Sequence, residues 1–225
     1  MSEFRTVNIP IRDRSLGMLV TEALESRVVE GLLAPDSRIN IDALSREMEV
    51  SQTPLRESLA RLESLGLVRL VPQRGYFVSP LLTRPEFEDL FEFRQRFEPW
   101  AAAQAAQIAT DEDKAWLQAE IDSAGKDVEK NGPWDDYLRV ASHDARFHER
   151  IAEMAGNQWI SDALKKSKVH VHLLRLYFIR RMGTDAIHEH QSVASSIIKG
   201  EPEAAKKAMS GHLESSRVRL GNTFF

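Results

Sequence analysis

The sequence predicts a mainly α fold in two parts, an N-terminal winged helix-turn-helix and a C-terminal all-α antiparallel helical bundle. Two observations support this expectation. Within residues 41–78, two short helical patterns separated by a tight turn are followed by two short β-type stretches. Beyond residue 85 the strand pattern disappears, and apolar residues recur with the helical period between Gly, Pro and Asn stop signals.

The helix-turn-helix is expected between residues 41 and 66. In its first helix, which ends at Met48, Leu44 and Met48 stand one turn apart on the same face. Ser51 is a good N-cap for the second helix, and Pro54 lies in the first turn, where a helix loses no hydrogen bond to proline. The polar side chains near the start of this second helix are then expected to point outward.

A small hairpin follows Gly66. Residues 67–71 and 76–78 are rich in β-branched and aromatic types, and the Pro-Gln-Arg-Gly sequence between them is typical of a turn. This hairpin is the expected wing beside the exposed start of the second helix. Winged helix-turn-helix proteins place such a helix in the major groove of DNA. We therefore expect contacts to double-stranded DNA from Ser51, Gln52, Thr53, Arg56, Arg74 and Gly75.

Prolines mark the boundary between the two parts. Pro80 and Pro85 interrupt any regular element, and Thr83 is suited to cap a new helix. The resulting domains are residues 1–80 for the winged helix-turn-helix, 81–85 for a linker and 86–225 for the helical part. Helical patterns cover residues 84–108, 111–129, 133–155, 158–182, 185–199 and 202–220.

Two pairs of residues in the helical part have the chemistry of metal ligands. Asp144 and His148 are four apart, so a helix places them one turn apart on one face. His190 precedes and His212 follows the Gly-Glu-Pro turn at residues 200–202 by ten residues each. An antiparallel hairpin therefore brings these two histidines to the same height.

Three imidazoles and one carboxylate that point into a bundle suit a divalent transition metal such as Zn, Ni or Mn, with positions left for water or a ligand. Periodicity leaves a second interpretation open, in which these are core histidines that hydrogen-bond to carbonyls or carboxylates. His143 and His188 are expected on the surface or behind the ligands. His170 and His172 are expected to pack, although one of them could line a pocket.

An open metal site with an anionic ligand calls for a second cation at the ligand's far end. Arg94 is the candidate, because Phe91 and Phe97 place it on the inward row of its helix. A guanidinium also suits a carboxylate, which it binds through two hydrogen bonds. An ordinary ion pair between Arg94 and Glu98, four residues apart, remains the alternative.

The N-terminal residues resemble the GntR family of bacterial transcription regulators. Its pattern of a Leu-Ala helix, a Val-Ser-Arg-Thr-Pro-Val-Arg-Glu-Ala-Leu recognition helix and an Arg-Gly wing is matched by residues 44–48, 50–59 and 74–75. The sequence departs from the pattern at Asp42, Glu49 and Gln52, which stand where the family has Arg in some members, Gly and Arg, respectively. The resemblance implies a homodimer that binds an inverted-repeat operator, with Arg56 retained as a DNA contact.

The helical part resembles the ligand-binding (FCD-type) domain of the FadR subfamily within that family. Its metal-binding members carry Asp-x-x-x-His, then Glu-His before an apolar helix, then a final His on the last helix. The matching residues here are Asp144, His148, Glu189, His190 and His212. The resemblance also implies that Arg94 faces an effector cavity, that the effector is a small organic acid, and that the protein is a repressor.

Composition limits the alternatives. The chain has 225 residues, no cysteine and a formal net charge of -4, so disulfides and thiolate metal sites are excluded. No stretch resembles a signal peptide or an apolar membrane span, so a cytoplasmic protein with no membrane partner is the expectation. The negative charge is unlike that of many DNA-binding proteins, so the phosphate-binding surface must be local.

We therefore expect a DNA-binding transcriptional regulator, not an enzyme, that is controlled by a small carboxylate at a metal site. Two alternatives are a metal-dependent hydrolase and a regulator whose metal is purely structural. A hydrolase would need a general base beside a metal-bound water. No His-Glu-x-x-His sequence, nucleophile elbow or phosphate loop occurs here, and a hydrolase has no use for a winged helix. The sequence leaves the structural metal open.

Overall fold

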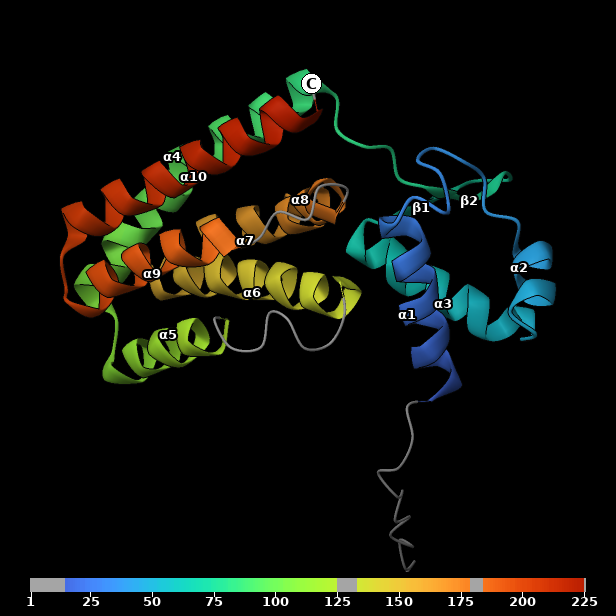
Figure 1. The fold of residues 1–225 in the computed structure, drawn as a ribbon, viewed down its shortest axis with the longest axis horizontal. Helices are drawn as coiled ribbons and strands as arrows, with labels where there is room; N and C mark the ends of the chain where they lie inside the picture. Colours follow the sequence, from blue (N-terminus) through green and yellow to red (C-terminus); the bar gives the residue numbers. More distant parts are fainter. Residues whose placement is uncertain (1–14, 125–132, 179–183, 225) are drawn as a thin grey trace, which may run out of the picture. The chain divides into compact units, whose positions relative to one another are not determined.

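The computed structural model describes residues 15–124, 133–178 and 184–224. The chain divides into two compact units, one that ends at Ser79 and one that begins at Pro80. The first contains a small β-sheet and the second is helical (Figure 1), so the predicted mainly α fold is confirmed. None of the described helices combines the length and the hydrophobicity needed to span a bilayer.

The N-terminal unit is a winged helix-turn-helix preceded by one more helix. Its elements are α1 (Leu16–Val29), α2 (Ile41–Glu47), α3 (Gln52–Leu65), β1 (Val68–Val71) and β2 (Gly75–Val78). The strands pair antiparallel, with Val68 opposite Val78. The backbone N–H of Ile39 donates to the carbonyl of Tyr76 at 2.9 Å, so the residues before α2 extend the wing along β2.

Helix α1 is not apparent from the sequence pattern. Val20, Leu24 and Val28 recur every four residues and are buried where α1 packs on α3. Leu16 and Leu19, near the start of the same helix, are exposed. These apolar residues on the outer face hide the amphipathic pattern by which a surface helix is usually found.

Left-handed backbone lies on both sides of α3. Glu49, in the turn between α2 and α3, has a φ of 54°, and Gly66, at the end of α3, has a φ of 87°. Glycine adopts this conformation without a steric penalty, whereas another residue costs roughly 1–2 kcal/mol. Ser51 occupies the N-cap position of α3 as predicted, but its side chain makes no capping hydrogen bond.

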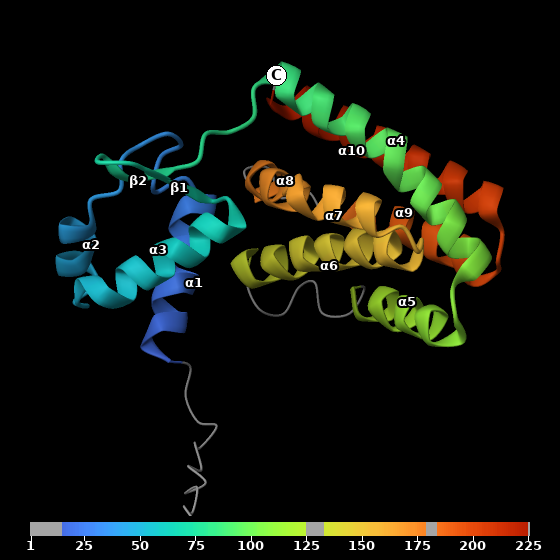
Figure 2. The same cartoon turned by 180° about the vertical axis from the view of Figure 1, so that it is seen from behind.

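The C-terminal unit is a helical bundle. Its helices are α4 (Arg84–Ile108), α5 (Asp111–Ala124), α6 (Pro133–Met154), α7 (Gln158–Lys166), α8 (Val169–Phe178), α9 (Thr184–Ile198) and α10 (Pro202–Phe224). Figure 1 and Figure 2 show α4 and α10 side by side, and α9 also packs on α10. Gly200, with a φ of 72°, allows the reversal between α9 and α10. Helix α4 begins inside the segment expected to be a linker, where Thr83 and Glu86 form a capping box.

The segment 158–182, expected to be one helix, forms two helices, so that expectation is wrong. Helix α7 ends at Lys166, and α8 begins at Val169 after Lys168, whose φ is 50°. Neither glycine nor proline marks this break, so the sequence carries no signal for it. The ends of two predicted helices, residues 125–129 and 179–182, lie outside the described residues.

The core of the bundle surrounds a group of buried polar side chains. Its apolar part includes Phe147 and Ile151 of α6, Val193 of α9 and Leu213 of α10. Burying each such side chain contributes roughly 1.5–3 kcal/mol. Beside them lie the buried ionisable residues Arg94, Glu98, His143, Asp144, His148, His190 and His212. Buried ionisable groups require partners, so this cluster is the candidate site.

Candidate metal centre and nucleic-acid interface

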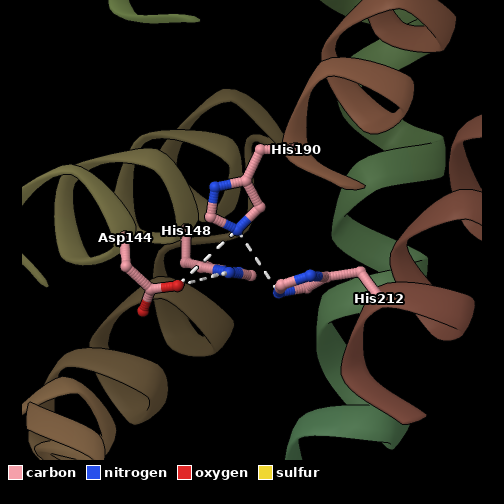
Figure 3. Close-up of side chains that lie close together, drawn as sticks. All are labelled: Asp144, His148, His190 and His212. Atoms are coloured by element: carbon pink, nitrogen blue, oxygen red, sulfur yellow. Dashed lines mark hydrogen bonds and ion pairs between the residues drawn. The ribbon is translucent and has the colours of Figure 1, made fainter. Parts of the chain in front are cut away.

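The four residues predicted as metal ligands converge at one point in the bundle (Figure 3). Asp144 and His148 come from successive turns of α6, His190 from α9 and His212 from α10. One ligand atom from each lies within 4.8 Å of the others, and all four residues are buried. His190 and His212 meet because each stands ten residues from the turn of an antiparallel hairpin.

Three of the separations between the converging atoms are close to the edges of a tetrahedral coordination shell, while the whole set lies within 4.8 Å. His190 Nε2 lies 3.3 Å from His212 Nε2 and 3.6 Å from Asp144 Oδ1. His148 Nε2 lies 3.7 Å from the same oxygen. Ligand atoms bound at the usual zinc distances in a tetrahedral site stand about 3.3–3.6 Å apart. The four side chains therefore lie close enough together that they could hold one divalent cation.

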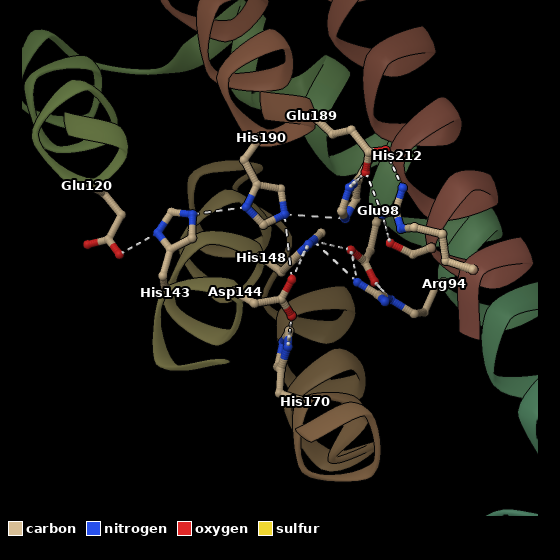
Figure 4. A network of polar contacts seen from close by, with 12 residues as sticks. Arg94, Glu98, Glu120, His143, Asp144, His148, His170, Glu189, His190 and His212 are labelled. Carbon is tan, nitrogen blue, oxygen red and sulfur yellow. Dashed lines mark hydrogen bonds and ion pairs between the residues drawn. The ribbon is translucent and has the colours of Figure 1, made fainter. Parts of the chain in front are cut away.

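Two of the histidines have their outer ring nitrogen held by a carboxylate (Figure 4). His148 Nδ1 lies 2.6 Å from Glu98 Oε2. His212 Nδ1 lies 2.8 Å from Glu189 Oε2, and Arg219 lies 2.5 Å from the other oxygen of that carboxylate. An ionised carboxylate only accepts hydrogen bonds, so both Nδ1 atoms carry the proton and both Nε2 atoms present a lone pair to a cation.

The third histidine, His190, is held by another histidine. Its Nδ1 lies 3.0 Å from Nε2 of His143, whose Nδ1 lies 2.9 Å from Glu120 Oε1. Because Glu120 accepts from His143 Nδ1, His143 Nε2 accepts from His190 Nδ1, which leaves His190 Nε2 unprotonated. Asp144 completes the set, since its Oδ2 lies 3.2 Å from His170 Nδ1 while its Oδ1 faces the other ligands.

This arrangement of protons leaves four acceptors and no donor facing one buried point. Three imidazole nitrogens and a carboxylate oxygen repel one another there unless a cation binds among them. Within the described residues, Nε2 of His148 is a buried nitrogen without a hydrogen-bond partner, which native structures rarely tolerate. Three nitrogens and one oxygen also suit a transition metal better than calcium or magnesium, so the residues present fit the expected metal.

Burial keeps two of the four predicted ligands, His148 and His190, neutral. It lowers the pKa of His148 to about 4, although Glu98 and Asp144 act in the opposite direction. It also lowers the pKa of His190 well below the ordinary value, an effect to which His212 and His148 add. A neutral imidazole is the form that binds metals, so the site is prepared for a cation near neutral pH.

Arg94 lies beside this cluster, on the inward face of α4. Its side chain is 1% exposed, with Nε 2.5 Å from Glu98 Oε1 and Nη2 3.3 Å from Glu98 Oε2. Burial acts to raise the pKa of Glu98, but Arg94 and then His148 outweigh it and hold that pKa well below its usual range. Arg94 therefore has the inward position expected of an effector-binding residue. It also forms the ion pair with Glu98 that the sequence left open as the alternative role.

Several partners of the ligands are not apparent from the sequence. His143 is buried and contacts His190, so a surface position is wrong for it; His188 is exposed. His170, expected to pack, contacts Asp144. Glu120 lies on α5, where it stands 23 residues from His143 along the chain. These residues contact the proposed ligands or their partners from other helices. Helical periodicity predicts which residues share a face of one helix, but not which helices contact one another.

His143→Ala is expected to weaken metal binding about 10- to 100-fold, the range typical of outer partners of a ligand. The variant removes the acceptor that fixes the tautomer and orientation of His190. Competition with a chromogenic chelator measures the affinity. His188→Ala is the matched control, because His188 is exposed on the same helix as His190. Equal affinities in the His143 variant and the wild type would contradict this role for His143.

In the N-terminal unit, the start of α3 and the wing carry the predicted DNA-contacting residues. Ser51, Gln52, Thr53, Arg56 and Arg74 are exposed, and Gly75 is partly exposed. A surface groove beside Arg56 is lined by Arg38, Asn40, Asp42, Arg56, Gly75 and Tyr76. Arg38 and Tyr76 are additions that no sequence pattern singles out. The groove joins the start of the helix to the wing, as a phosphate and base-edge contact surface requires.

Polar contacts link three residues of this surface. Gln52 Nε2 donates to Asp42 Oδ1 at 2.6 Å, and Arg56 Nη2 donates to Gln52 Oε1 at 3.3 Å. Each end of the Gln52 amide therefore makes one hydrogen bond within this surface. The expected pairing of Gln52 with adenine can use the second N–H of Nε2 and the second lone pair of Oε1, which these contacts leave available.

Each of the two units matches a known protein family. Residues 18–78 match the family of bacterial regulatory proteins described as the gntR family. Residues 89–215 match the FCD domain. The first match covers the helix-turn-helix with its wing, and the second covers all four predicted metal ligands.

Related proteins cover most of the chain at low identity. The HTH-type transcriptional repressor RspR of Escherichia coli (strain K12) is 25% identical, over 85% of this chain and 82% of its own length. The putative L-lactate dehydrogenase operon regulatory protein of the same strain is 28% identical, over 93% and 84%. The solved structure of E. coli McbR/YncC has a TM-score of 0.67 at 18% identity and covers 95% of this chain and 100% of its own. A putative GntR regulator from Rhodococcus sp. RHA1 has a TM-score of 0.67 at 20% identity, over 93% and 99%, and both show the same fold.

Proposed function

Because this chain belongs to the GntR family of bacterial regulatory proteins and carries an FCD domain, we propose that a metal-bound carboxylate controls its binding to DNA. The chain is a transcriptional regulator and not an enzyme, as its families and relatives are. The metal, the effector and the direction of the response are the proposal. The observation that carries it is the buried set of four cation-binding atoms at Asp144, His148, His190 and His212.

In the proposed site, these four residues hold a divalent transition metal: zinc, nickel or manganese. When bound, the metal supplies a positive centre that attracts the carboxylate of an organic acid. The choice of metal matters, because four protein ligands fill a tetrahedral zinc site, whereas octahedral coordination leaves two positions for an effector. A filled tetrahedral site is the structural-metal alternative, and an effector response distinguishes the two.

Arg94 is proposed to bind the effector at its other end. The Nη2 atom of Arg94 lies 3.5 Å from His148 Nδ1, so the guanidinium adjoins the ligand set. Glu98 holds both of these residues at once, since its two oxygens bond Arg94 and His148. An anion that binds Arg94 would therefore compete with the Glu98 carboxylate for that guanidinium. The same carboxylate positions His148, one of the proposed metal ligands.

We further propose that the protein acts as a homodimeric repressor of the FadR subfamily. A two-fold dimer presents two α3 helices to half-sites about 34–36 Å apart, which makes the operator an inverted repeat. The relative RspR is named a transcriptional repressor, which supports this direction of control. Effector binding would favour one arrangement of the bundle and so shift the affinity for DNA.

Small carboxylates are expected to raise the melting temperature of the metal-loaded protein, because a ligand that binds only the folded state stabilises it by about 2.7 kcal/mol at 100 times its Kd. Lactate, malate and citrate are suitable probes, with neutral sugars as negative controls. Arg94→Lys should reduce the shift, since lysine keeps the charge beside Glu98 but lacks the planar pair of donors. Differential scanning fluorimetry with nickel-loaded and zinc-loaded protein measures the effect.

The control for this experiment is Arg96→Lys. Arg96 lies on the same helix and pairs with a glutamate four residues away, but its side chain is 69% exposed. Its variant should keep the full shift. If no carboxylate moves the melting temperature of metal-loaded wild type, the structural-metal alternative replaces the proposal.

A further inference from the structure

We propose that helix α8 connects the metal centre to the linker that precedes α4, and that Arg175 is the residue through which the connection acts. This inference rests on the proposed function, because it concerns how the state of the metal site reaches the segment leading to the DNA-binding unit. Three features of α8 support it: a contact with a metal ligand near one end, a contact with the linker further along, and a backbone break where the helix begins.

The start of α8 contacts the metal centre. His170, in the first turn, places Nδ1 3.2 Å from Oδ2 of Asp144, while the other oxygen of Asp144 faces the ligand histidines. A change in how Asp144 holds a cation therefore changes the position of the oxygen that His170 contacts. Figure 4 shows this contact between His170 and Asp144.

Five residues further along, α8 holds the linker. The side chain of Arg175 is almost fully buried, at 3% exposed, and its Nη1 donates to the carbonyl of Pro80 at 2.9 Å. Burial lowers the pKa of Arg175 to about 10, so it keeps its charge at neutral pH and forms a charge-assisted hydrogen bond. Pro80 directly follows Ser79, the last residue of the N-terminal unit.

Apolar packing also holds α8 against the linker and the start of α4. Val169 and Leu173 of α8 form a buried cluster with Phe87 and Phe91 of α4, and the linker residue Leu82 packs against it. The guanidinium of Arg94 lies over the ring of Phe91, 5.5 Å from its centroid. The proposed metal ligands therefore contact α8 through Asp144. Arg94, the proposed effector-binding residue, contacts it through Phe91 and this cluster.

The break before α8 makes it a separate rigid helix. Lys168, with a φ of 50°, ends the path of α7, so α8 is not a continuation of that helix. The span from His170 to Arg175 is five residues, which corresponds to a rise of about 7.5 Å along a rigid helix. A displacement of the first turn is thus carried over a short distance to the carbonyl of Pro80, without requiring the longer helices to move.

The test compares zinc-free and zinc-loaded full-length protein. A DNA duplex selected by the wild type from a random-sequence pool serves as the probe, and fluorescence anisotropy gives its Kd in both states. Coupling of this kind is typically about 5- to 150-fold. Arg175→Met, which keeps the apolar stem and removes the hydrogen bond, should reduce the coupling to about twofold or less. Zinc affinity should stay within threefold of the wild type, as roughly expected for a residue outside the ligand shell.

Leu82→Ala is the second variant, because it loosens the linker from the apolar cluster and leaves Arg175 in place; it should also lower the coupling. Arg96→Met controls for the loss of an arginine on the exposed face of α4. Full coupling in folded Arg175→Met and Leu82→Ala would overturn the inference. So would a loss of zinc affinity that accounts for the whole loss of coupling.

Hydrogen exchange separates this inference from the proposed function. Zinc should protect the amides of residues 81 and 82 in the wild type and not in Arg175→Met. A metal-loaded wild type whose DNA affinity does not respond to any carboxylate would contradict the proposed function, whereas the exchange result with and without zinc judges the role of α8 by itself. Identical exchange at these amides with and without zinc would reject the role of α8.

Discussion

His190→Ala and His212→Ala are each expected to lose stoichiometric metal. Both remove a ligand atom that no neighbouring side chain replaces in the described cluster, since the four atoms at Asp144, His148, His190 and His212 are the set that converges. The loss of affinity should exceed the roughly 100-fold upper range for an outer partner such as His143. Elemental analysis of the purified variants measures the stoichiometry, and isothermal titration measures what affinity remains.

His188→Ala is the control for this experiment, because His188 is two residues from His190 on α9 yet exposed. It should retain wild-type metal content. The melting temperature is a second measurement. Bound metal stabilises only the folded chain, so metal should raise the melting temperature of the wild type but not that of either ligand variant. If either ligand variant still carried one metal per chain, the ligand set would be wrong.

Arg56→Ala is expected to abolish the preference for the operator over unrelated DNA. Arg56 is exposed near the start of α3 and receives support from Gln52, which Asp42 holds in turn. A bidentate pairing of arginine with guanine is worth about 1–3 kcal/mol of discrimination, or about 5- to 150-fold. Footprinting and competition with unrelated duplexes would measure the loss.

Arg74→Ala provides the contrast within the same surface. Arg74 stands at the wing, with its guanidinium over the ring of Phe77 at 5.1 Å from the centroid. Loss of a phosphate contact there should weaken binding about evenly across sequences and reduce its salt dependence. Equal sequence preference in Arg56→Ala and the wild type would falsify the assignment of the recognition helix, even if the chain still bound DNA.

The parts of the site that the sequence predicts are those fixed by local geometry. Asp144 and His148 share a helical face because they are four residues apart, and His190 meets His212 because both are equally far from one turn. Both relations depend on a single helix or a single hairpin. The same reasoning explains why the recognition helix is found at Gln52–Leu65.

What the sequence does not reveal depends on contacts between distant elements. Glu120 reaches His143 from α5, and His170 reaches Asp144 from α8, but no period or motif links these residues along the chain. The break at Lys168 is hidden for another reason. A lysine in the left-handed region is uncommon, and no glycine or asparagine marks this position in the sequence.

The origin of the metal ligands in three separate helices has a consequence for folding cooperativity. A cation held by α6, α9 and α10 acts as a cross-link that closes the chain between His148 and His190 and fixes the terminal hairpin. The predicted ligands all lie in the unit that begins at Pro80. If the proposed metal binds there, we expect its supply to change the unfolding free energy of the helical unit and not that of the winged helix-turn-helix.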